Sequence, residues 1–172
     1  RRTVPELDLE RPETIASAAT ELAAEAPYHL IVHAAGLLHR EGIKPEKSIS
    51  ALEPEALQAV FQVNTLGPAI VLRDFLPLLA PRGAMAMLSA KVGSIGDNRL
   101  GGWYAYRASK AALNMLIKTA AIELARTRPH SRLLSLHPGT VISGLSHPFR
   151  VDDSARPADV AAARLLTLID PS

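Results

Sequence analysis

Short unbroken runs of apolar residues alternate along the chain with longer stretches in which apolar residues recur every three or four positions. The short runs are typical of buried strands, and the longer stretches are typical of amphipathic helices. Strands are predicted at residues 29–36, 83–90 and 131–140, with the end of another strand at residues 3–10. Helices are predicted at residues 11–26, 53–79, 104–126 and 156–169.

Prolines, glycines and polar residues mark the boundaries of these elements. Pro12 and Pro54 stand in the first turns of two predicted helices, where a missing backbone N–H is tolerated. Glycine, Asp and Asn at residues 93–102 indicate a loop. Strands that alternate with helices indicate βαβ units, so the sequence predicts an α/β fold with a parallel sheet covered on both faces. In such folds ligands bind beyond the carboxyl ends of the strands.

Composition narrows the class of protein. A length of 172 residues predicts a single domain, and 48% hydrophobic residues suffice for a core. Lys and Arg total 19 against 17 Asp and Glu, which gives no indication of a nucleic-acid or membrane surface. The absence of cysteine excludes disulfides and cysteine-bound metal. No long apolar run or signal peptide is visible, so we expect a cytoplasmic protein.

The stretch GGWYAYRASKAALN at residues 101–114 carries the first candidate chemistry. Tyr106 and Lys110 lie four residues apart on a predicted helix, a rise of roughly 6 Å, so both can face one cleft. A phenol has a pKa near ~10, and a neighbouring ammonium lowers it. The pair is therefore a candidate proton donor with its tuning charge. The alternative is a buried aromatic residue beside a solvated lysine, because this spacing alone is common by chance.

Three segments together resemble the short-chain dehydrogenase/reductase superfamily. They are LSAKVGSIGDN at residues 88–98, YAYRASK at 104–110 and HPGTV at 137–141. The combination is similar to the C-factor or Sniffer-like carbonyl reductase branch, and the resemblance runs from about residue 7 to 169. It implies a Rossmann-type doubly wound sheet in one domain at residues 1–172. That fold begins with a βαβα portion that carries a glycine-rich phosphate loop, and it ends with a last strand. Neither part has a counterpart in this sequence, so the domain is expected to be incomplete.

The resemblance also implies catalytic roles. Tyr106 would protonate the carbonyl oxygen of a substrate during reduction, and Lys110 would hold the nicotinamide ribose and lower the pKa of Tyr106. Asn64 would interrupt the long helix and support a water-linked proton relay. The superfamily carries a Ser-Ser pair after the fifth strand of its sheet, where this chain has Ser89 followed by alanine. Either Ser89, which we favour, or Ser94 would supply the hydroxyl.

The cofactor implied is NADP, with NAD possible, because the residue that distinguishes them has no counterpart in this chain. Asp8 and Leu9 match the turn that contacts adenine. His33 and Ala34 replace two asparagines of the turn that lines the cofactor, and we expect His33 to be structural. The other residues implied to bind the cofactor are Ala35, Gly36, Pro138, Gly139, Val141 and Ser143, together with Tyr106 and Lys110.

The function implied is an NAD(P)-dependent oxidoreductase that reduces a small apolar ketone or aldehyde. Trp103, Leu145, Pro148 and Phe149 would form the substrate pocket. One alternative is a catalytically weakened binding or signalling protein on the same scaffold, and another is a non-functional truncated fragment. The partners expected are a small carbonyl substrate, no nucleic acid and no membrane. We also expect a homodimer or homotetramer, formed through the helices at 53–79 and 104–126.

Overall fold

The structure, a computed structural model, describes residues 6–146, 148–149 and 155–169. Its centre is a parallel sheet with the strand order β1-β2-β3. The strands are β1 (Tyr28–His33), β2 (Leu79–Leu88) and β3 (Arg132–Leu136). Ile31, Met85 and Leu133 lie side by side across them. Because the strands are parallel, their carboxyl ends meet at one edge of the sheet.

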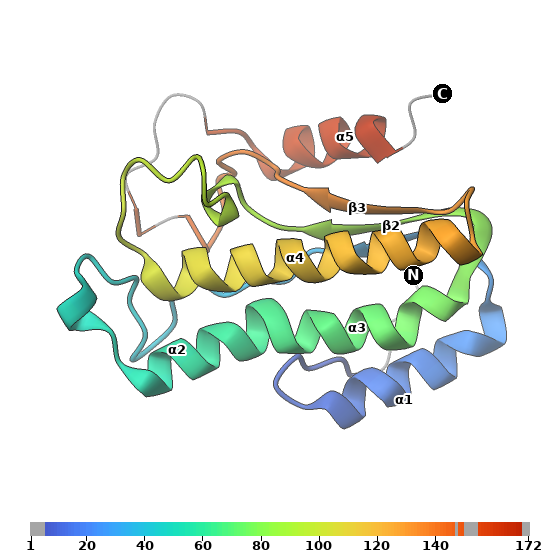
Figure 1. Ribbon diagram of the computed structural model, residues 1–172, viewed down its shortest axis with the longest axis horizontal. Helices are drawn as coiled ribbons and strands as arrows, with labels where there is room; N and C mark the ends of the chain where they lie inside the picture. The colour runs from blue at the N-terminus through green and yellow to red at the C-terminus, as the bar shows by residue number, and fades with distance from the viewer. Residues whose placement is uncertain (1–5, 147, 150–154, 170–172) are drawn as a thin grey trace.

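Helices cover one face of this sheet. The α4 helix lies against the strands, α3 runs beside it and α1 lies beyond α3 (Figure 1). The helices on this side are α1 (Pro12–Leu22), α2 (Pro54–Phe61), α3 (Gly67–Phe75) and α4 (Tyr104–Thr127). The main core lies between them and the sheet, where Ile15, Met85 and Leu113 are fully buried.

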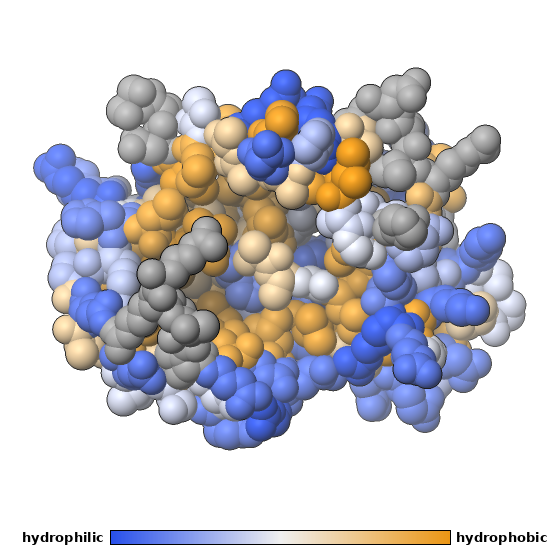
Figure 2. All heavy atoms as spheres, turned by 180° about the vertical axis from the view of Figure 1, so that it is seen from behind, coloured by the Kyte–Doolittle hydropathy of each residue, from blue (hydrophilic) through white to orange (hydrophobic). Residues whose placement is uncertain are grey.

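The opposite face of the sheet is covered by α5 (Ala158–Ile169), in which Ile169 packs on Ala84 and Ala86 of β2. The fold is therefore the doubly wound α/β fold that the sequence predicts, with three strands in the described residues. Leu30 and Val32 of β1 remain exposed beside this second core. Figure 2 shows the back of the molecule relative to Figure 1, where apolar side chains surround a hollow.

The helix predicted at 53–79 is a single rod with an irregular middle. Between α2 and α3 the backbone of Gln62–Leu66 forms a π-helical turn, and a 3₁₀ turn at Leu76–Leu78 follows α3. Pro68 explains the irregularity, because it has no N–H to donate to the C=O of Asn64, as the α-helical pattern would require. Asn64 lies within this π-helical turn, at the position where the resemblance implies an interruption of the long helix.

The other predicted elements differ mainly at their ends. A 3₁₀ turn at Ala23–Glu25 extends α1, which accounts for most of the predicted helix at 11–26. Further 3₁₀ turns lie at Ile49–Ala51 and Lys91–Gly93. The strand predicted at 3–10 is wrong for its described part, since residues 6–8 are irregular and 9–10 form a turn that leads into α1. Residues 3–5 lie outside the described residues.

Candidate functional site

Tyr106 and Lys110 lie in the first two turns of α4, at the carboxyl edge of the sheet. Both side chains are buried, and the Lys110 Nζ lies 5.9 Å from the centroid of the Tyr106 ring. The same Nζ donates a hydrogen bond of 3.2 Å to the backbone oxygen of Leu88, the last residue of β2. The end of a strand and the start of a helix thus hold the ammonium beside the phenol.

Gly36 brings its backbone close to the end of this lysine side chain. A Cβ placed on Gly36 would lie 3.3 Å from the Lys110 Nζ and 3.4 Å from the Asn64 Oδ1. Either contact is tighter than most Cβ contacts in proteins. Glycine therefore leaves the ammonium accessible from the turn that follows β1.

Asn64 connects the π-helical turn to the rest of the site. Its side chain is fully buried, accepts a hydrogen bond of 2.7 Å from the N–H of Leu37 and donates one of 2.7 Å to the C=O of Leu37. Its Nδ2 also donates to the Ser109 Oγ at 3.1 Å. One amide therefore fixes the turn after β1 against α4, next to Lys110.

A cavity of about 760 Å³ opens at this edge of the sheet. It brings together most of the residues that the sequence singles out, from four separate turns and the start of α4. They are Ala34, Ala35, Gly36, Ser89, Trp103, Tyr106, Lys110, Pro138, Gly139, Val141, Ser143, Leu145 and Phe149. No carboxylate is among the described residues that line it, whereas Lys91, Lys110 and His137 contribute basic groups.

Among the predicted site residues, Asn64, Asp8 and Leu9 lie outside the cavity lining, and so does Pro148 of the expected substrate pocket. Asn64 lies behind the cavity, as described above. Asp8 instead accepts hydrogen bonds from the Glu10 N–H and from Arg11, and the Glu10 contact is the main reason that the pKa of its carboxyl is lowered. Leu9 packs in the core, and its backbone lies against Gly67. Within the described residues, Asp8 and Leu9 shape the entry to α1 rather than the cavity.

The two candidate serines differ in position. Ser89 follows β2, its N–H donates to the Leu136 C=O at 2.8 Å, and its side chain lines the cavity. Its Oγ is buried and has no hydrogen-bond partner. Ser94 is exposed, and its Oγ accepts a hydrogen bond from the Asp97 N–H. The geometry therefore favours Ser89 as the hydroxyl of the site.

Burial dominates the electrostatics of the pair on α4. It lowers the pKa of Lys110 to about 8 and raises the pKa of Tyr106. The expectation that Lys110 lowers the pKa of Tyr106 is therefore wrong for this arrangement, because the loss of hydration disfavours the phenolate. A raised pKa keeps the phenol protonated at neutral pH, which is the form that donates a proton.

His33, the last residue of β1, is buried, and neither of its ring nitrogens has a hydrogen-bond partner. Burial, and secondly the positive charge of Lys110, lower its pKa to about 4. His33 is therefore neutral at pH 7. The His33 side chain makes no hydrogen bond that would hold the turn after β1 in place.

Sequence reasoning missed Glu46, whose buried carboxylate accepts a hydrogen bond from the Ala105 N–H at 3.2 Å. The first turn of α4 needs an acceptor for such N–H groups, and the residue at its N-cap, Trp103, supplies no side-chain hydrogen bond. Glu46 also presents a negative charge to the positive end of the helix dipole. It lies 59 residues away from its partner in the chain, so no local pattern could reveal it.

Trp103 has a left-handed backbone, with φ 52° and ψ 46°. Residues other than glycine and asparagine rarely adopt this conformation, which costs about 1–2 kcal/mol. Gly101 and Gly102 precede it with φ of 64° each, and these glycines are the signal by which the sequence marks an unusual turn.

The residues present fit a nicotinamide nucleotide. Gly36 leaves backbone room beside Lys110, the unpartnered Ser89 Oγ offers a hydrogen bond, and the described lining carries basic groups without carboxylates. A metal site has no such support, since no cluster of three or more His, Cys, Asp or Glu suited to a metal occurs within residues 6–146, 148–149 and 155–169. In the same part of the chain, no helix is long and apolar enough to cross a membrane.

Comparisons with known proteins bear on this site. A family model described as enoyl-(acyl carrier protein) reductase matches residues 1–171. The 1-hydroxy-2-glutathionyl-2-methyl-3-butene dehydrogenase of Rhodococcus sp. (strain AD45) is 30% identical over 166 residues, which are 96% of this chain and 70% of that protein. The C-signal protein of Myxococcus xanthus is 38% identical over 114 residues, which are 64% of each chain.

Solved structures with this fold include reductases. The carbonyl reductase Sniffer of D. melanogaster superposes with a TM-score of 0.82 at 25% identity, covering 97% of this chain and 69% of its own. A short-chain dehydrogenase/reductase from Burkholderia multivorans with bound NADP has a TM-score of 0.81 at 26% identity, covering 95% of this chain and 66% of its own. The chain therefore spans about two thirds of the length of these proteins.

Proposed function

The chain belongs to the short-chain dehydrogenase/reductase family of oxidoreductases, and from this premise we propose that it reduces a small apolar ketone or aldehyde with a nicotinamide cofactor. The observation that carries the proposal is the buried Tyr106–Lys110 pair at the edge of a cavity whose described lining residues include no carboxylate. Trp103, Leu145 and Phe149 line the same cavity and give it an apolar wall.

The cofactor, when bound, supplies the hydride that reaches the carbonyl carbon. The nicotinamide half of the cofactor would be held by Lys110, by the turns at Ala34–Gly36 and Pro138–Gly139, and by Val141 and Ser143. The bound NADP of the Burkholderia multivorans structure supports NADP as the cofactor proposed here, with NAD as the alternative.

Tyr106 is the proton donor in this proposal. Its phenol is protonated at neutral pH because burial raises the pKa, and its Oη transfers the proton to the carbonyl oxygen as that oxygen gains electrons. Ser89 would donate a hydrogen bond to the same oxygen, which would give its buried hydroxyl the partner that it lacks.

Lys110 restores the proton of Tyr106 in this scheme. Its pKa of about 8 lies closer to neutrality than that of an exposed lysine, so its ammonium can release a proton and regain one from solvent. Asn64 and its contacts with Leu37 and Ser109 keep the lysine and the turn after β1 in register. Asn64 is thus proposed as a positioning residue for the relay.

The experiment that tests the proposal measures oxidation of NADPH by this chain with simple ketones and aldehydes. Tyr106→Phe removes the transferred proton and retains the ring, so we expect turnover to fall by about 10²-fold or more. Tyr104→Phe is the matched control, because Tyr104 does not line the cavity. Equal turnover by Tyr106→Phe and the original protein would refute the assignment of Tyr106.

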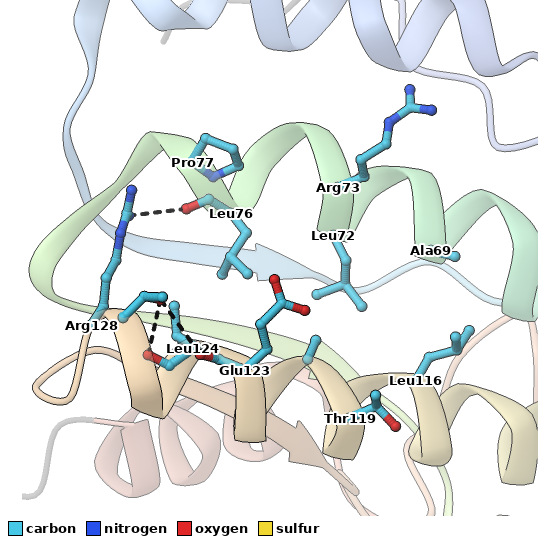
Figure 3. Close-up of a pocket in the computed structure, with 12 residues that line it drawn as sticks. Ala69, Leu72, Arg73, Leu76, Pro77, Leu116, Thr119, Glu123, Leu124 and Arg128 are labelled. Atoms are coloured by element: carbon cyan, nitrogen blue, oxygen red, sulfur yellow. Dashed lines mark hydrogen bonds between the residues drawn. The ribbon is translucent and has the colours of Figure 1, made fainter.

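A homo-oligomer formed through α3 and α4 is part of the proposal. A groove of about 510 Å³ runs between these helices, and Figure 3 shows Leu72 and Leu76 facing Leu116 and Glu123 across it. Met115 and Ile122 are further exposed apolar residues of α4. A second copy of the chain is the proposed occupant, since apolar side chains on a helix face are otherwise unfavourably exposed.

A further inference from the structure

A row of aromatic rings leads away from the proposed proton donor. The Trp103 ring meets the Tyr106 ring edge to face, with centroids 6.2 Å apart at 74°. The Phe149 ring lies 5.2 Å from Trp103, and the His39 ring lies 5.5 Å from Phe149 at 67°. Trp103, Tyr106 and Phe149 all line the cavity. The aromatic wall, as we call these three residues, therefore begins at the phenol itself.

The backbone that carries Trp103 is held in place from several directions. Its N–H donates to the C=O of Glu46, and the Glu46 carboxylate accepts a hydrogen bond from the N–H of Ala105, two residues further along the chain. The Arg107 Nε donates to the C=O groups of Gly101 and Gly102, at 3.2 and 2.9 Å. These contacts come from both sides of the turn and keep Trp103 in its left-handed conformation.

A glycine or asparagine would adopt this backbone conformation with less strain than tryptophan. Packing in the core does not explain the choice, because Trp103 is only half-buried and is absent from both core clusters. Strained residues that the surrounding structure holds in place concentrate at functional sites. The strain therefore indicates a functional role for the Trp103 ring, which lies against Tyr106 and lines the cavity.

We propose that Trp103 is a specificity-determining residue, which selects carbonyl substrates whose carbonyl group is attached to an aromatic ring. This inference rests on the proposed function. A substrate whose carbonyl oxygen meets the Tyr106 hydroxyl has its substituents near the aromatic wall, where a planar ring can stack or pack edge to face. A saturated ring of the same size lacks the quadrupole that favours such contacts.

The test compares acetophenone with cyclohexyl methyl ketone, which differ in the aromaticity of one ring. We expect the original protein to have the higher kcat/KM for acetophenone. Trp103→Asn removes the ring and should reduce the ratio of the two kcat/KM values by about 3- to 10-fold. Trp103→Phe retains an aromatic ring and should keep most of the preference. Tyr104→Asn, a change at the neighbouring residue outside the cavity, should leave the ratio unchanged.

Two further measurements keep the outcomes separate. Asparagine tolerates a left-handed backbone, so the thermal midpoint of Trp103→Asn should not fall below that of Trp103→Ala. Trp103 is the single tryptophan of the chain, so saturable quenching of its fluorescence reports acetophenone binding without turnover. Calorimetry measures the same binding in Trp103→Asn, which has no indole.

Turnover of both ketones with an unchanged ratio in a folded Trp103→Asn would overturn the role of Trp103 and leave the proposed function intact. Binding of acetophenone that weakens in Trp103→Asn, without any turnover in the original protein, would support the aromatic seat and contradict the proposed function. Absence of acetophenone binding, together with absence of turnover of both ketones and of the simple aldehydes, would overturn both.

Discussion

At the scale of single residues, two side chains of the described structure have buried polar atoms without a partner, namely His33 and Ser89. An unpartnered buried polar group costs about 1–3 kcal/mol, so it requires a reason. Ser89 lines the cavity, where a substrate oxygen would satisfy it. His33 does not line the cavity. Its burial instead makes the stability of the fold depend on pH.

We predict that His33 makes the fold sensitive to acid. Its pKa is about 4 in the folded state against an ordinary 6.5, so between these values the unfolded chain binds a proton that the folded chain does not. Stability is therefore lost as the pH falls from 6.5 towards 4, by on the order of 2 kcal/mol between pH 7 and 5. Urea unfolding at both pH values measures this loss.

The control for this prediction is His33→Asn, which places at this position the residue that the resemblance suggests. Asparagine does not titrate, so the loss between pH 7 and 5 should be smaller by about the same 2 kcal/mol. The carboxylates of the chain are common to both proteins and drop out of the comparison. An identical pH dependence in both would contradict a neutral buried His33.

At this scale, the sequence could predict a contact between two site residues only where both residues lie close together in the chain. Tyr106 and Lys110 share one helix face, so their spacing predicted their juxtaposition. Glu46 caps the same helix from a distant loop, and Trp103 owes its conformation to contacts that only the folded chain provides. The pKa of Tyr106 was predicted in the wrong direction, because burial depends on the whole fold.

At the scale of elements, the π-helical turn at Gln62–Leu66 connects local backbone irregularity to the site. The periodicity predicted one helix over 53–79 and could not fix the type of turn within it. Pro68 was the local signal, and the contacts of Asn64 with Leu37 and Ser109 supply the tertiary reason. The strand expected at 3–10 is wrong for its described part, because alternating apolar residues such as Leu7 and Leu9 do not distinguish a strand from a turn packed on the core.

We predict that Asn64→Leu destabilises the fold by roughly 2–4 kcal/mol. The substitution leaves the N–H and C=O of Leu37 without their side-chain partner, and each orphaned group costs about 1–3 kcal/mol less what local relaxation and water recover. Chemical denaturation measures the change in unfolding free energy. Gln58→Leu on α2, a substitution that removes an amide away from these contacts, is the control and should change stability by less than about 0.5 kcal/mol. Equal effects of the two substitutions would contradict the bracing role of Asn64.

At the scale of the whole molecule, the parallel sheet and the covering of both of its faces followed from the alternation of patterns along the chain. The convergence of the turns at one edge followed as well, because parallel strands end together. How the molecule meets other copies does not follow from these patterns, since apolar positions on α3 and α4 can serve either the core or an interface.

We predict that Leu116→Glu on α4 dissociates the proposed homo-oligomer, because a buried unpaired carboxylate strongly opposes association. Light scattering at micromolar concentration measures the mass in solution. Leu100→Glu is the matched control, since Leu100 is 92% exposed and lies outside the groove. A monomeric mass for the original protein would refute this interface.

The two ends of the sheet have separate attachments. At the amino ends of the strands, the Arg128 guanidinium donates to the C=O of Leu79, and the Ser131 hydroxyl donates to the C=O groups of Ala80 and Pro81. The candidate site lies at the other end of β2, roughly 20 Å away, because the register with β1 is irregular between Tyr28 and Leu30 and shortens the path of β2 along the sheet. Substitutions so far apart have additive free-energy effects. In this chain, substitutions that change the anchoring of the strands can therefore accumulate in evolution independently of substitutions that change the candidate site.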